Sequence, residues 1–213
     1  MPSDAAGLDA VTVDAFGTLV ELDAPAGRLR AALAARGVDR DLATVEAAFA
    51  AEVAYYLEHK VEGRDDETLA ALRAGCAGIF LAAAEADLDA AEFSPDFVEA
   101  LVFRPFEGAE EALETLAAAG LVLACVSDWD VGLAAQLERA GVARHFATVV
   151  SSAETGAEKP DPSVFRRALD DLDVSSERAL HIGDSESDEA GAAAAGLAFA
   201  PLPLATLPQR LGL

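Results

Sequence analysis

Short apolar segments of high β propensity alternate with helix-length segments along most of this chain. The predicted strands cover residues 10–14, 121–126, 147–151, 179–182 and, more weakly, 198–199. Helical patterns follow at 107–119, 131–140, 162–169 and 189–195. Strands that alternate with helices pair in parallel through right-handed crossovers. The sequence therefore predicts an α/β fold, with a Rossmann-like parallel sheet and helices on both of its faces.

The stretch between the first two strands has a different pattern, with helices and no strand signal. Its predicted helices cover residues 26–36, 42–60, 65–86 and 94–102, and glycines or acidic first turns mark several of their ends. We interpret residues 23–103 as a four-helix cap inserted into a core domain. That core comprises residues 1–22 and 104–213.

Polar and charged residues follow the predicted strands at the points where they end. Asp14 ends the first strand, Ser127 and Asp128 follow the second, Lys159 lies in the loop after the third, and Asp184 comes after the fourth. The carboxyl ends of parallel strands lie on one edge of a sheet, where open α/β folds bind ligands. Alone, each residue is more typical of a helix cap or a solvated surface. Together and in this order they predict transfer of an anionic group with a divalent cation.

Elementary chemistry assigns roles within this set. Asp14 and Asp184 offer the hard oxygen ligands that suit Mg²⁺, and Asp188 faces the same side near the start of a helix. Lys159 and the cation would offset phosphoryl charge, and the Ser127 hydroxyl can hold a phosphoryl oxygen. Asp14 can attack phosphorus in line, forming an acyl phosphate that water hydrolyses.

Four segments resemble the motifs of the haloacid dehalogenase superfamily: residues 14–19 (DAFGTL), 126–128 (VSD), 158–162 (EKPDP) and 183–188 (GDSESD). The inserted helices resemble its helical-cap subfamily, so the resemblance covers nearly the whole chain. It implies a Rossmann-like core, a nucleophile at Asp14, and Mg²⁺ held by Asp14, Asp184 and the backbone carbonyl of Phe16.

The resemblance also associates substrate choice with the cap and with the loop after the first motif. We expect substrate contacts from Thr18 and Asp128 of the core, and from Tyr56 and His59 on the second cap helix. An ordinary solvated helix end is the alternative interpretation of the two cap residues. His181, inside a predicted buried strand, is interpreted as structural.

Phe16 departs from the pattern, because most phosphatases of that superfamily carry a second Asp there as general acid and base. Such help contributes about 10²–10⁴-fold. Three alternatives stay open: a phosphatase or phosphotransferase with another proton donor, for which Asp128 is a candidate; a 2-haloacid dehalogenase, whose halide leaves without a proton; and a weakly active or non-catalytic phosphate-binding protein. The retained Asp184 favours the first. So does Phe165, where those dehalogenases carry a tyrosine.

Charge narrows the range of partners. The chain has 38 Asp plus Glu against 15 Lys plus Arg, a formal net charge of −23. A surface this acidic repels nucleic acid and anionic lipid, so neither is an expected partner. Residues 1–10 lack the pattern of an export signal, and no apolar stretch approaches the roughly 18 residues of a membrane span. We expect a cytoplasmic protein with a small phosphorylated substrate, as a monomer or a homodimer.

Overall fold

The computed structural model describes residues 7–213, which fold into two compact units. Of the described residues, the first, the core unit, comprises residues 7–21 and 103–213, and the second, the inserted unit, comprises residues 22–102. Residues 1–6 lie outside the described residues. They belong to the predicted core domain and to residues 1–10, in which the sequence showed no export-signal pattern. Within residues 7–213, no helix is both long and apolar enough to cross a membrane.

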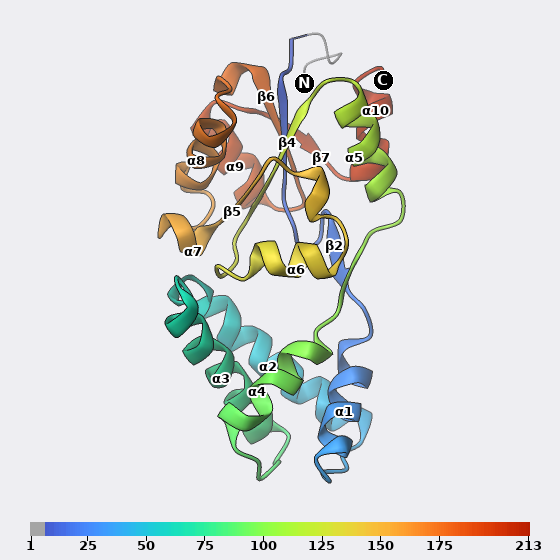
Figure 1. Ribbon diagram of the computed structural model, residues 1–213, viewed down its shortest axis with the longest axis vertical. Coiled ribbons are helices and arrows are strands. Elements are labelled where there is room, and N and C mark those ends of the chain that lie inside the picture. The colour runs from blue at the N-terminus through green and yellow to red at the C-terminus, as the bar shows by residue number, and fades with distance from the viewer. Residues whose placement is uncertain (1–6) are drawn as a thin grey trace. The chain divides into compact units, whose positions relative to one another are not determined.

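A five-stranded sheet, of order β5-β4-β1-β6-β7, forms the centre of the core unit (Figure 1). Its strands are β1 (Ala10–Val13), β4 (Val122–Ser127), β5 (Thr148–Ser151), β6 (Ala179–Gly183) and β7 (Ala198–Pro201). Each neighbouring pair is parallel. Val13 of β1 lies in register with Cys125 of β4 and Ile182 of β6, so three strands end at nearly the same level. The predicted parallel α/β sheet is confirmed.

Helices cover both faces of this sheet, as the sequence predicted. One face carries α5 (Ala109–Ala118), α6 (Leu133–Arg139) and α10 (Leu207–Arg210), and the other carries α8 (Ser163–Leu172) and α9 (Glu186–Ala195). Short helical turns complete the unit: η2 (Ala143–His145), α7 (Ser152–Thr155), η3 (Ser176–Arg178) and η4 (Leu204–Thr206).

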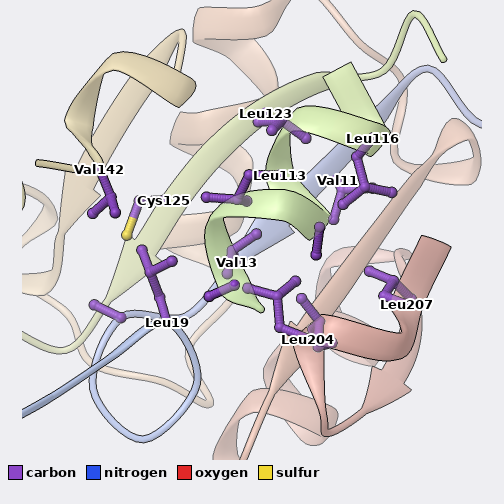
Figure 2. Packing of buried hydrophobic residues seen from close by; sticks show 14 of the residues in the cluster. Val11, Val13, Leu19, Leu113, Leu116, Leu123, Cys125, Val142, Leu204 and Leu207 are labelled. Atoms are coloured by element: carbon purple, nitrogen blue, oxygen red, sulfur yellow. The ribbon is translucent and has the colours of Figure 1, made fainter. Parts of the chain in front are cut away.

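Alternation along the strands explains the two layers. Val11 and Val13 of β1 point to the face where α5 packs with Leu113 and Leu116, as Figure 2 shows. The intervening strand positions serve the other face, where Ala124 and Val126 of β4, for example, pack with residues of α8. Because successive strand side chains point to opposite sides, a strand buried on both faces is nearly all apolar.

The sequence did not predict a two-stranded sheet of β2 (Val20–Leu22) and β3 (Phe103–Pro105). These strands lie where the chain leaves the core unit and returns to it. The backbone N–H of Phe106 donates to the Leu19 carbonyl at 3.0 Å, which continues the association past β3. Strands of three residues are too short for an alternating pattern to be recognised in the sequence.

Residues 22–102, all of them described, contain four α-helices and one 3₁₀ turn. They are α1 (Pro25–Ala35), α2 (Leu42–His59), η1 (Lys60–Glu62), α3 (Asp66–Ala83) and α4 (Ala90–Ala100). Side chains of Asp41, Asp65 and Asp89 cap α2, α3 and α4 by accepting backbone N–H groups three residues later.

The predicted start of the last of these helices, at Ser94, is wrong. The Asp89 cap starts α4 at Ala90, so Pro95 lies inside the helix rather than at its beginning. An interior proline removes a backbone hydrogen bond. Burial of Phe93 and Phe97 offsets this loss, because both are almost fully inaccessible and contact the Phe80 ring, with centroids 6.2 and 5.3 Å away.

Glu52 of α2 is a carboxyl group buried inside the inserted unit. Its exposed fraction is 4%, and it forms a hydrogen bond with Cys76 of α3. Burial raises the pKa of Glu52 from 4.5 to about 7, and the bond to Cys76 opposes this only in part. The carboxyl is therefore protonated in the folded chain over a pH range in which it ionises in the unfolded chain.

This burial predicts a pH-dependent stability. The protonated Glu52 contributes stability that is fully present below pH 4.5 and is lost as the pH rises to about 7. Glu52→Gln removes this titration, so the variant should not lose stability as the pH rises. The difference in free energy of unfolding, variant minus wild type, should therefore be about 3 kcal/mol larger at neutral pH than in acid. Urea unfolding followed by circular dichroism at several pH values measures this difference. Glu58→Gln, exposed on the same helix, is the control, and a wild-type-minus-variant difference independent of pH would contradict the account.

Candidate active site

Asp14 immediately follows β1, the central strand, and extends its pairing by one residue. Its backbone N–H donates to the Ile182 carbonyl of β6 at 3.0 Å. The side chain is almost completely buried, and its Oδ1 accepts hydrogen bonds from Ser127 Oγ at 2.9 Å and from Lys159 Nζ at 2.6 Å. The structure thus brings together the three residues that the sequence proposed as catalytic.

Lys159 is a buried cation, with an exposed fraction of 8%. Its Nζ donates to Asp14 Oδ1, to Asp188 Oδ1 at 2.5 Å and to the Val126 carbonyl at 3.3 Å. Burial disfavours the ammonium, but the two carboxylates outweigh it and hold the pKa of Lys159 above its usual value. Asp128 helps to position this lysine through its backbone, because the Asp128 Oδ1 accepts the Lys159 backbone N–H at 3.0 Å.

Asp188 is fixed through both of its carboxylate oxygens. The Ser185 hydroxyl caps α9 by accepting the Asp188 backbone N–H, and Asp188 Oδ2 accepts the Ser185 backbone N–H in return, both at 3.1 Å. Oδ1 faces Lys159 and His181 Nε2, the latter at 3.0 Å. Burial opposes ionisation, but the bonds to His181 and Lys159 prevail and lower the pKa of Asp188. A Cβ at position 183 would lie 2.4 Å from the Asp188 Cγ, so Gly183 is required there.

Asp184 follows β6 and lies at the more open side of the group. Carboxylate oxygens of Asp14, Asp184 and Asp188 lie within 4.8 Å of one another. Burial, followed by repulsion from Asp14 and Asp188, raises the pKa of Asp184. Gly17 makes the approach possible: its φ is 85°, and a Cβ there would lie 2.3 Å from Asp184 Oδ2.

We call Asp14, Asp184 and Asp188 the carboxylate cluster. Hard anionic oxygens that converge this closely are a donor set that Mg²⁺ accepts, because Mg²⁺ binds one or two carboxylates and fills its other positions with water and substrate oxygens. A cation would also offset the charge of the three carboxylates, which the single Lys159 ammonium balances only in part. The residues present therefore fit a divalent ion.

The loop after the nucleophile contains Phe16 and Thr18. The Phe16 ring is 51% exposed and meets the Phe103 ring edge-on, with centroids 6.4 Å apart. A phenyl ring supplies no proton. The Thr18 hydroxyl is buried and has no hydrogen-bond partner among the described residues, which is uncommon for a buried hydroxyl.

Tyr56 and His59 lie on α2 of the inserted unit. Tyr56 is half-buried against the core of that unit. The His59 ring stacks on Tyr55 with centroids 4.1 Å apart, and its Nδ1 is 2.8 Å from the Tyr55 carbonyl. These contacts are internal to the unit, and the substrate contacts predicted for Tyr56 and His59 stay predictions.

The sequence did not connect two further residues, Thr12 and His181, to the site. They are in register on β1 and β6, and His181 contacts Asp188 directly. Each is the polar residue within a strand that is otherwise apolar up to its end. Two polar residues placed just before Asp14 and Asp184, on strands that flank one another, were the signal that could have revealed the pair.

The core unit is therefore an α/β domain with acidic residues and a buried lysine at the carboxyl edge of its parallel sheet, the edge where such folds bind ligands. A sequence profile described as haloacid dehalogenase-like hydrolase matches residues 8–196. The chain therefore belongs to the haloacid dehalogenase-like hydrolases, as its motifs suggested.

The chain is similar to some known proteins in sequence and to others in structure. The chain is 40% identical over 103 residues to haloacid dehalogenase-like hydrolase domain-containing protein 3 of Bos taurus, and 38% identical over 108 residues to phosphoglycolate phosphatase of Rhodospirillum rubrum. The matches span 48% and 50% of this chain, but only 41% and 44% of those proteins. A 2-haloacid dehalogenase from Pseudomonas syringae superimposes with a TM-score of 0.67 at 23% identity, covering 96% of this chain and 98% of that one. The last similarity shows a shared fold.

Proposed function

We propose that this chain hydrolyses phosphate monoesters of small molecules, with Mg²⁺, through a phosphorylated Asp14. The observation that carries the proposal is the meeting of Asp14, Lys159 and the carboxylate cluster at one point of the sheet edge. The phosphoglycolate phosphatase similarity supports a phosphate ester as substrate.

Asp14 and Asp184 would hold Mg²⁺, together with the backbone carbonyl of Phe16, and Asp188 would support the ion or its water shell. When bound, the ion offsets the charge of the phosphoryl oxygens, which the carboxylates would otherwise repel. The closeness of the carboxylate oxygens is what supports this assignment.

The chain's own residues account for two steps. In the first, a carboxylate oxygen of Asp14 attacks phosphorus, the bond from phosphorus to the ester oxygen breaks, and the leaving oxygen departs as an alkoxide or phenolate that takes a proton from water. Lys159 stays protonated and balances the charge of the phosphoryl group. The Ser127 hydroxyl, which donates a hydrogen bond to Asp14 Oδ1 in the structure, is placed to hold a phosphoryl oxygen. In the second, water attacks phosphorus and gives up a proton to solvent, the bond from phosphorus to the Asp14 oxygen breaks, and inorganic phosphate departs from the restored carboxylate.

The inserted unit is proposed to act as a cap that selects the substrate, with Tyr56 and His59 among its contacts, and Thr18 and Asp128 on the core side. The unpartnered Thr18 hydroxyl supports its role. The acidic composition disfavours nucleic acid and anionic membranes as partners, and a small anionic substrate must then be held by local positive charge. We further propose that the protein is a cytoplasmic monomer or homodimer.

A direct assay compares three outcomes. An aryl phosphate should release phosphate with Mg²⁺ and stop doing so in EDTA. Release of chloride from 2-chloropropionate in EDTA would instead identify a dehalogenase, for which the aromatic Phe16 is the observation in favour, since a halide needs no proton. Phosphate binding without turnover of either compound would identify a binding protein.

Phe16→Asp tests the account of the missing acid. A carboxyl group here should raise kcat/KM for an alkyl phosphate by at least about a hundredfold, the lower end of the range expected of general acid catalysis. An aryl phosphate, whose leaving group is stable without a proton, should change by less than about threefold. Because the Phe16 side chain is largely exposed, the fold should tolerate the change. Phe16→Asn is the control that lacks the proton, and equal gains for both substrates would contradict the account.

A further inference from the structure

Beneath the carboxylate cluster lies a polar pair that the proposed chemistry leaves unused. Thr12 and His181 face each other on the adjacent strands β1 and β6, and both are completely inaccessible. Thr12 Oγ1 is 2.8 Å from His181 Nδ1, and His181 Nε2 is 3.0 Å from Asp188 Oδ1. Two hydrogen bonds therefore run from the interior of the sheet through the imidazole ring to Asp188.

The acceptors around the ring determine which nitrogen carries hydrogen. Asp188 Oδ1 already accepts from the Lys159 ammonium at 2.5 Å, so it is a carboxylate oxygen and can only accept. His181 Nε2 must then donate. On the other side, the Thr12 hydroxyl can donate to an unprotonated Nδ1, whereas the Thr12 backbone carbonyl, 3.1 Å from Nδ1, can only accept. The hydroxyl, at 2.8 Å, is nearer to Nδ1 than the carbonyl is. Where it donates, it selects the Nε2–H tautomer, because the bond made by one ring nitrogen sets the state of the other.

The bond from His181 has a consequence for charge. Three carboxylates and one ammonium leave an excess of negative charge in the cluster. A second cation beside Asp188 would also hold its carboxylate, but it would lower the attraction for a divalent ion. A neutral ring donor fixes Asp188 and leaves that attraction intact. The rings of Phe165 and Phe199, with centroids 4.8 and 6.3 Å from that of His181, pack around it.

We infer that His181 is a positioning residue, held by the Thr12 hydroxyl as the Nε2–H tautomer, that fixes Asp188 for cation binding beside Lys159. The inference deepens the proposed function and rests on it where Mg²⁺ is concerned. The tautomer itself is a property of the folded chain without any ligand, so the two can fail separately.

Nitrogen NMR of the imidazole rings tests the tautomer. The chain has three histidines, and substituting each in turn assigns its signals in a long-range ¹H–¹⁵N correlation spectrum. His181 should show a protonated Nε2 and an unprotonated Nδ1. Thr12→Val, which exchanges the hydroxyl for a methyl group, removes the donor to Nδ1, so a protonated Nδ1 should appear beside the Nε2–H that Asp188 retains, and Thr12→Ser should retain the wild-type pattern. An Nδ1–H or doubly protonated ring in the wild type would overturn the inference.

Calorimetric titration with Mg²⁺ tests the consequence. His181→Leu should weaken Mg²⁺ binding about 10–100-fold, the usual cost of losing a group that orients a metal ligand. His181→Gln places an amide N–H near the position of Nε2–H and should stay within about threefold of wild type. Equal affinity of the Leu variant and wild type, or equal losses in Gln and Leu variants that melt normally, would overturn the inference.

The Thr12 variants decide the question if His181→Leu fails to fold. Thr12→Val should bind Mg²⁺ more weakly than Thr12→Ser by several-fold, in parallel with the protonation of Nδ1, and equal binding would overturn the inference. A wild-type chain that shows the Nε2–H tautomer but binds no Mg²⁺ would contradict the proposed function. That result would also overturn the role in cation binding, and leave His181 as a support for Asp188 alone.

Discussion

Asp14→Asn should abolish turnover of an aryl phosphate, with a loss of at least about a thousandfold in kcat at saturating Mg²⁺. An amide is a poor nucleophile, whereas its size and its carbonyl oxygen match those of the carboxylate. That oxygen can still accept from Ser127 and Lys159, whose donors now lie 2.9 and 2.6 Å from Asp14 Oδ1. The variant should therefore keep the fold and the network while losing the covalent step.

Initial rates, with circular dichroism as a check on folding, measure this effect. Asp170→Asn on the exposed surface of α8 is the matched control and should retain wild-type activity. An Asp14→Asn enzyme that keeps a tenth or more of the wild-type rate would mean that another group forms the bond to phosphorus.

Lys159→Met should have the second-largest effect, on stability as well as on activity. The substitution keeps most of the volume but removes the one ammonium that contacts both Asp14 and Asp188. Removing one partner of a buried ion pair typically costs about 3–5 kcal/mol, because the other charge stays behind unpaired. Turnover should fall by at least about a hundredfold, since the phosphoryl charge loses its balancing cation.

Mg²⁺ should act on this variant in a distinctive way. A cluster without the ammonium is more negative, so the ion should raise the free energy of unfolding more in Lys159→Met than in the wild type. Urea unfolding with and without Mg²⁺ measures the stability lost by the substitution and the stability gained from the ion. Arg166→Met, exposed on α8, is the control. Weaker stabilisation by Mg²⁺ in the lysine variant would contradict the assignment of the carboxylate cluster as a cation site.

The parallel sheet was predictable because its strands are buried on both faces and are separated by helices. That pattern is visible from single stretches such as residues 10–13 and 179–183. Strands β2 and β3 were not predictable, because a strand of three residues is too short to show a periodic pattern. The start of α4 was misplaced because Pro95 is a strong helix-start signal, whereas burial of Phe93 and Phe97 depends on tertiary packing.

The site was predictable to the extent that topology determines it. Residues that follow parallel strands meet at one edge of the sheet, and this brings Asp14, Ser127 and Lys159 together whatever the loops between them. The role of His181 was not predictable, because it depends on the register of β1 against β6 and on the rotamer of Asp188. Neither quantity is readable from one sequence.

Chemical trapping of the intermediate tests the central claim most directly. The chain is incubated with an aryl phosphate and Mg²⁺, quenched with borohydride, and digested for mass spectrometry, because borohydride reduces an aspartyl phosphate to homoserine. We predict homoserine at position 14 alone, and none in EDTA. Steady release of phosphate with residue 14 unmodified, or with the label at another carboxylate, would contradict the account.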